Sequence, residues 1–175
     1  MITSKTSAIE KYTDICGARK SGYEANQRRR SGRIIWSDPR SAGAASAPDG
    51  SFPWMASLFL RRDSGEAYFM CAATILSSRV LVSAAHCFSD KYRDSDWFVR
   101  VGDNYIISKD PNEQTFQVNQ IVRHEKFFAL SSPGGDGRHD VALLQIKTRH
   151  GGKGIKFDKY VTPACLPQQG EPYER

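Results

Sequence analysis

Short β-like runs separated by turn-rich segments dominate residues 54–146 of this 175-residue chain. Each run is rich in β-branched and aromatic residues, which favour strands, and no long amphipathic helical pattern accompanies them. The runs are WMASLFL (54–60), AYFMCAATIL (67–76), RVLVSAA (79–85), WFVRVG (97–102), TFQVNQIV (115–122) and VALLQI (141–146). Six such runs predict an all-β sandwich or barrel, and closure into a barrel would remove exposed strand edges.

Two segments without a strand pattern flank these runs. Residues 1–50 are rich in Arg, Ser, Gly, Ala and Pro, which indicates a flexible, protease-accessible leader. Residues 147–175 are rich in Gly, Lys and Pro, which indicates an extended connector. We therefore expect one folded unit over residues 51–146, between a leader and a connector.

The net charge of +6 is concentrated in the leader. Residues 1–40 hold nine lysines and arginines against four acidic residues, whereas residues 41–175 hold sixteen against fifteen. No groove-reading or aromatic-stacking motif accompanies the basic leader, so we expect no nucleic-acid partner. No run of 18 apolar residues occurs, so we expect no membrane span.

Four cysteines stand at positions 16, 71, 87 and 165, without a C-x-x-C pair that would indicate zinc or a redox motif. An even number of such cysteines indicates disulfides and an oxidising compartment. The first twenty residues nevertheless lack the apolar stretch of a secretory signal. We expect either that a preceding exon is missing or that the chain is not exported as written.

Five segments occur together in one order: SFPWMASLFL, CAATILSSRVLVSAAHCF, RVGDNY, HDVALLQI and VTPACLP. In this order and spacing they resemble the trypsin-like (chymotrypsin-fold) serine proteases, from about Ser41 to the C-terminus, with Cys16 as an outlying part of the pattern. The resemblance implies the first of the family's two barrels, an antiparallel six-stranded Greek-key barrel. It also implies an extracellular protein that acts on protein or peptide substrates.

The resemblance assigns two catalytic residues. His86 matches the general base of the family's triad, and Asp140 matches the carboxylate that orients this base. His139 stands where the family usually has Asn, which is a small departure. We assign no role to His124 or His150.

The third member of the triad is missing from the sequence. The family places its nucleophilic serine after the aspartate, in a G-D-S-G-G segment of the second barrel, but no serine follows Asp140 here. The oxyanion hole and the specificity pocket belong to that barrel as well. We interpret the chain as the N-terminal half of a protease, inactive alone, from a partial gene model or a splice product. The alternative is a catalytically dead half-protease that acts as a binding or decoy module.

The resemblance also implies how the cysteines pair. Cys71 and Cys87 match the family's disulfide around the histidine. Cys16 and Cys165 match the bridge that keeps a cleaved propeptide attached to the catalytic domain.

The activation site departs most from the family, which is cut after a basic residue by an activating protease to expose R-[IV]-[IV]-G-G. Arg33 precedes Ile34 and Ile35, but the glycines are lost, and an in-frame insertion of residues 36–42 would explain the excess length. Cleavage after Arg40 would restore the length with a Ser-Ala start, which would fill an apolar activation pocket poorly. We prefer the insertion.

One acidic loop resembles the calcium loop found in some members of the family. Asp103, Asp110 and Glu113 would supply carboxylates, and Tyr105 and Ser108 would supply backbone carbonyl oxygens. Such loops are also often merely solvated. We therefore expect no required cofactor and consider a structural calcium ion possible.

Overall fold

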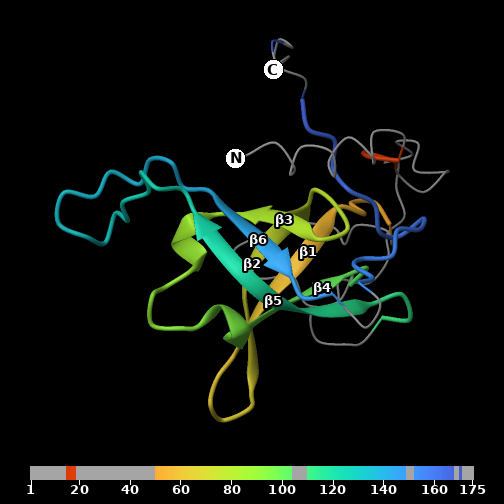
Figure 1. The fold of residues 1–175 in the computed structure, drawn as a ribbon, viewed down its shortest axis with the longest axis horizontal. Coiled ribbons are helices and arrows are strands. Elements are labelled where there is room, and N and C mark those ends of the chain that lie inside the picture. Colours follow the sequence, from red (N-terminus) through yellow and green to blue (C-terminus); the bar gives the residue numbers. More distant parts are fainter. Residues whose placement is uncertain (1–14, 19–49, 104–109, 149–151, 168–169, 171–175) are drawn as a thin grey trace, which may run out of the picture.

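A computed structural model describes residues 15–18, 50–103, 110–148, 152–167 and 170 (Figure 1). Within these residues it contains six strands and two short 3₁₀ helices, and the strands coincide with the six predicted runs. The strands are β1 (Met55–Arg61), β2 (Ala67–Ile75), β3 (Val80–Ser83), β4 (Trp97–Val101), β5 (Gln114–Arg123) and β6 (Ala142–Ile146), and the 3₁₀ helices are η1 (Ala85–Cys87) and η2 (Asp94–Asp96). No helix in this described part is long and apolar enough to cross a membrane.

The six strands form a closed antiparallel barrel in the order β1-β2-β3-β6-β5-β4. Closure is achieved by β1, which pairs with both β2 and β4. Spatial and sequence order differ at β3, which pairs with β6 instead of β4, and this crossing gives the Greek-key connection. The predicted all-β fold class is thus confirmed, in its barrel form.

Alternating side chains of the strands fill the interior of the barrel, as the period of two along a strand requires. In β1 the inward residues are Ala56, Leu58 and Leu60, and all three are buried. Trp97 and Phe88 close one part of this core with their rings in an edge-to-face contact at 5.0 Å. The other buried strand residues in the core are Ala73, Ile75, Leu81, Val99, Val101, Phe116, Val118, Ala142, Leu144 and Ile146.

Part of the predicted connector also belongs to the core. Ile155 and Val161 are buried in the same hydrophobic cluster as the strands. Backbone hydrogen bonds hold this segment against the barrel: the Thr162 N–H donates to Pro53 O (3.0 Å) and the Ala164 N–H to Ile75 O (2.8 Å). The segment after β6 therefore helps to build the barrel, although no strand pattern marks it.

Candidate active site

His86 lies in η1, directly after β3, and the packing of its neighbours fixes its position. Ala85 and Phe88 on either side are buried in the core, whereas the His86 side chain is 64% exposed. Cys87 forms a disulfide with Cys71 of β2, with an S–S distance of 2.05 Å. The segment is thus tied to the barrel on both sides of an imidazole that remains accessible.

Asp140 lies just before β6, and strand pairing brings it to His86. Since Ser83 of β3 pairs with Ala142 of β6, the end of β3 and the start of β6 are neighbours. The Asp140 Oδ2 atom lies 2.7 Å from His86 Nδ1, and the His86 backbone N–H donates to Oδ1 at 2.8 Å. Two residues that are 54 positions apart in the sequence therefore share two hydrogen bonds.

These hydrogen bonds favour the ionised form of Asp140 and orient the His86 ring. The bond from the His86 side chain, followed by the bond from its backbone, lowers the pKa of Asp140 below its ordinary value of 3.8. An ionised Asp140 only accepts hydrogen bonds, so His86 Nδ1 is the donor. The lone pair of the neutral imidazole is then on Nε2, which makes Nε2 the nitrogen able to accept a proton.

A second histidine pair, which the sequence reasoning missed, lies beside Asp140. The rings of His124 and His139 are stacked, with 4.7 Å between their centroids and 12° between their planes. His139 has a φ of 57°, and it is the one non-glycine residue with positive φ in the described part of the chain. No sequence signal indicates this contact, because the two residues meet only through the loop between β5 and β6.

The second predicted cysteine pair is also bonded in the structure. Cys16 and Cys165 are joined with an S–S distance of 2.10 Å. The Gly17 N–H donates to Pro163 O at 2.8 Å, and the Thr162 Oγ1 hydroxyl donates to Ala18 O at 3.0 Å. Residues 15–18 are thus attached to the segment after β6. The expected cleavage positions, Arg33 and Arg40, lie outside the described residues.

The residues of the expected calcium loop are described in part, because Tyr105 and Ser108 lie outside the described ranges. Both carboxylate oxygens of Asp103 are buried, and Glu113 Oε2 is buried without a hydrogen-bond partner. The other Glu113 oxygen lies 3.8 Å from Arg100 Nε.

One group of three ligand-type side chains lies close together in the described ranges, and it does not suit a metal. It consists of Cys71, His86 and Cys87, with ligand atoms within 4.8 Å of one another. Its two sulfur atoms are bonded to each other, so they are not thiolates. The calcium site stays a prediction.

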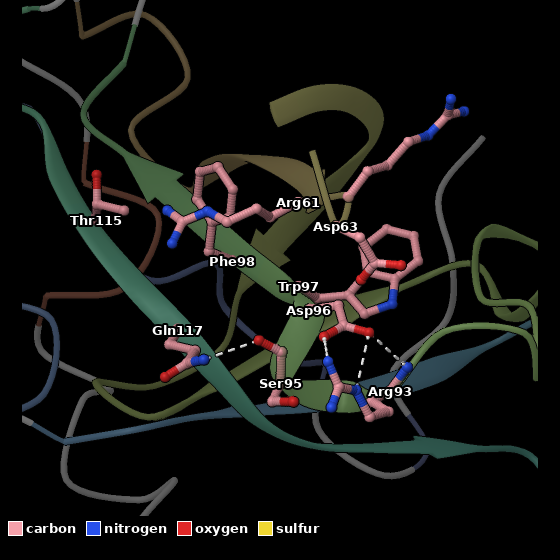
Figure 2. A pocket seen from close by; sticks show the side chains of 10 residues that line it. Arg61, Asp63, Arg93, Ser95, Asp96, Trp97, Phe98, Thr115 and Gln117 are labelled. Atoms are coloured by element: carbon pink, nitrogen blue, oxygen red, sulfur yellow. Dashed lines mark hydrogen bonds and ion pairs between the residues drawn. The ribbon is translucent and has the colours of Figure 1, made fainter. Parts of the chain in front are cut away.

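Two of the hollows lined by the described residues lie on the outside of the barrel. The larger hollow has a volume of about 350 Å³ and is shown in Figure 2. Among its lining residues, the Arg61 guanidinium lies over the Phe98 ring at 5.3 Å, and Arg93 forms an ion pair with Asp96. Neither His86 nor Asp140 lines it. The smaller hollow, about 270 Å³, borders Asp140 and is lined by Met55, Ala72, Ala73, Thr74, Val82, Ser83 and Ala84. This smaller hollow therefore adjoins the Asp140 member of the His86–Asp140 pair.

The closed Greek-key barrel, with an accessible imidazole held by an ionised carboxylate at its surface, indicates the class of serine hydrolases that use a Ser-His-Asp triad. Comparison with known proteins supports this class. The family model described as Trypsin matches residues 42–174. The Transmembrane protease serine 9 of Rattus norvegicus is 33% identical over 139 residues, which are 79% of this chain and 11% of that protein.

The chain belongs to the trypsin family, as the five sequence segments predict. It spans about 11% of the length of the curated relative that it matches, so the activity of a whole protease is a matter of proposal for this chain.

Proposed function

We propose that the chain is the N-terminal part of a secreted trypsin-like serine endopeptidase and contributes two of its three triad residues. His86 is the general base and Asp140 the carboxylate that orients it. The observation that carries this proposal is the pair of hydrogen bonds, 2.7 and 2.8 Å long, between Asp140 and the ring and backbone of His86. The trypsin family implies protein substrates.

In the proposed reaction, Asp140 holds the imidazole in the tautomer with its proton on Nδ1. His86 Nε2 then takes the proton of a serine hydroxyl as that oxygen attacks the scissile carbonyl, and returns the proton to the leaving amine. Asp140 stabilises the imidazolium in between. The serine, the oxyanion-hole donors and the specificity pocket would come from a second barrel outside these 175 residues.

We propose further that an activating protease cleaves the leader after Arg33, with Arg40 as the alternative. The Cys16–Cys165 disulfide spans 149 positions and encloses both arginines. Cleavage at either position would therefore leave residues 15–18 bound to the barrel. An extracellular location is supported by the two disulfides.

A structural calcium ion is a further part of this proposal. Its fit is supported by the buried, unpartnered Oε2 of Glu113, since Ca²⁺ prefers carboxylate and carbonyl oxygens. Asp103 and Asp110 would be further ligands. The ion would order the loop and take no part in the proton transfer.

Thermal unfolding with and without Ca²⁺ tests this ion. We expect Ca²⁺ to raise the Tm of the wild-type chain, and Glu113→Gln to abolish the increase, because binding to the native state stabilises it. Mg²⁺ at the same concentration is the control. An equal increase in the Glu113→Gln variant would contradict a site at this loop.

Peptidase assays of two proteins test the proposed function. Recombinant 1–175 should not hydrolyse an arginine or aromatic peptide ester. A longer product of the same gene with a G-D-S-G-G segment should do so, and His86→Ala should abolish its activity. Hydrolysis by residues 1–175 that is lost in His86→Ala would contradict the proposal that the triad serine lies outside these residues. A stop codon directly after Arg175 in full-length mRNA would instead support the binding or decoy module.

A further inference from the structure

The residue before Asp140 is held in an unfavourable backbone conformation. A φ of 57° places His139 in the left-handed region, which Gly adopts freely and which every other residue enters at a cost, although Asn, Asp and His do so more often than the rest. The peptide that follows this residue sets the direction in which Asp140 leaves the loop. If His139 returned to an ordinary conformation, the Asp140 carboxylate would move away from His86.

Contacts with the end of β5 hold this conformation in place. The His139 ring is stacked on His124, with centroids 4.7 Å apart. Next to the stack, the Val141 N–H donates to His139 O at 2.7 Å, and the His124 N–H donates to Val141 O at 2.9 Å. The stack and these two bonds therefore tie the residues on both sides of Asp140 to His124.

His124 is itself fixed by the turn that follows it. Its Nδ1 accepts a hydrogen bond from the Lys126 N–H at 3.1 Å, and its carbonyl oxygen accepts one from the Phe127 N–H at 2.9 Å. These local hydrogen bonds thus orient the His124 ring independently of its contact with His139. In Figure 1 the long loop between β5 and β6 extends away from the barrel and returns to it.

We propose that His124 is a positioning residue for the His86–Asp140 pair. Its ring stabilises the left-handed conformation of His139 and thereby directs Asp140 toward His86. This inference rests on the proposed function, because it explains how the base and its carboxylate are kept together. The stack with His124 also explains how histidine is accommodated at position 139, where Asn would adopt the left-handed conformation without a stacked ring.

The test uses the 175-residue chain and the tautomer of His86. The ¹⁵N shifts of the His86 imidazole report the ratio of the Nδ1–H to the Nε2–H form, and contact with Asp140 favours the Nδ1–H form. We expect His124→Ala to lower this ratio by about two- to tenfold, the range that corresponds to the loss of one aromatic contact. His124→Phe, which keeps a flat ring but lacks the Nδ1 acceptor for the Lys126 N–H, should retain more of the wild-type ratio than His124→Ala.

A double-mutant cycle separates positioning from general destabilisation. In a His139→Asn background, His124→Ala should leave the His86 ratio unchanged, because Asn adopts the left-handed conformation without a stacked ring. Leu130→Ala is the matched control, since this side chain belongs to the same loop and is 76% exposed. It should change neither the ratio nor the Tm.

The inference is overturned if His124→Ala leaves the His86 ratio unchanged, or if it lowers the ratio equally in the His139→Asn background. If His124→Ala does not fold, His124→Leu repeats the test, because Leu retains apolar bulk but offers no flat ring. Failure of the proposed function would look different. A longer protease without peptidase activity would contradict that function, while the tautomer ratio would still report on the stack.

Discussion

Both carboxylate oxygens of Asp140 are hydrogen-bonded to His86. Oδ2 contacts the imidazole ring, and Oδ1 accepts from the backbone N–H. The double contact fixes the direction of the carboxylate as well as its distance. An orienting group needs this property, because the tautomer of the imidazole depends on which nitrogen faces the carboxylate. The stability of the chain should therefore depend on the ionisation of Asp140.

We expect Asp140 to contribute to the pH dependence of unfolding. Its hydrogen bonds with His86 lower its pKa in the folded state below the ordinary 3.8, so the ionised form favours folding. This contribution is complete above the unfolded-state pKa and is lost as the pH falls through the folded-state pKa. Urea unfolding between pH 7 and pH 2 should show the wild-type free energy decreasing below about pH 4.

Asp140→Asn is the control for this decrease. Its free energy of unfolding should be lower than that of the wild type near pH 7, and the difference between the two proteins should shrink below about pH 4. A difference that stays constant down to pH 2 would show that ionisation of Asp140 does not stabilise the fold.

At the level of elements, the segment after β6 acts as a part of the barrel wall. Val161 is fully buried in the core, and the backbone beside it is hydrogen-bonded to Pro53 O, just before β1. Gly102, directly after β4, allows this close approach. A Cβ atom at position 102 would lie 3.0 Å from Val161 Cγ2 and 2.6 Å from Asn112 O.

Val161→Ala should lower the free energy of unfolding by about 2–3 kcal/mol, because it removes two methyl groups from a close-packed core and leaves a cavity. Val122→Ala is the matched control, since the Val122 side chain is 52% exposed and its loss should cost less than ~0.5 kcal/mol. Both values can be measured by urea unfolding. Equal effects of the two substitutions would contradict a structural role for the segment after β6.

At the scale of the whole molecule, the two disulfides enclose chain segments of very different length. Cys71–Cys87 closes 16 positions, which corresponds to roughly 3 kcal/mol in the chain-entropy description. Cys16–Cys165 closes 149 positions and joins the segment before the barrel to the segment after β6. The long bridge would therefore keep both pieces together if the leader were cleaved at the proposed positions.

Limited digestion with an arginine-specific protease should give two pieces that stay joined. Cleavage after Arg33 or Arg40 lies inside the loop closed by Cys16 and Cys165. One band should appear in a non-reducing gel and two in a reducing gel. Cys165→Ser should release the N-terminal piece even without reductant. Release of that piece from the wild-type chain without reductant would show that the bridge does not form.

Much of the fold could be predicted from the sequence because strand formation leaves a local signal. The runs WMASLFL (54–60) and VALLQI (141–146), rich in apolar residues between turn-rich segments, correspond to β1 and β6. The segment containing Ile155 and Val161 was not recognised as core. Its burial comes from irregular backbone packed on the barrel, which has no sequence period.

The sequence by itself determined the six strands, the family and the residue types available for chemistry, because these depend on local composition and on the order of short segments along the chain. Only the tertiary structure decided that two oxygens of Asp140 meet His86 across 54 positions, and that His124 is stacked on His139. Both contacts are non-local, since they depend on the register of β3 with β6 and of β5 with β6. Contacts between distant residues of this kind leave no pattern in neighbouring residues.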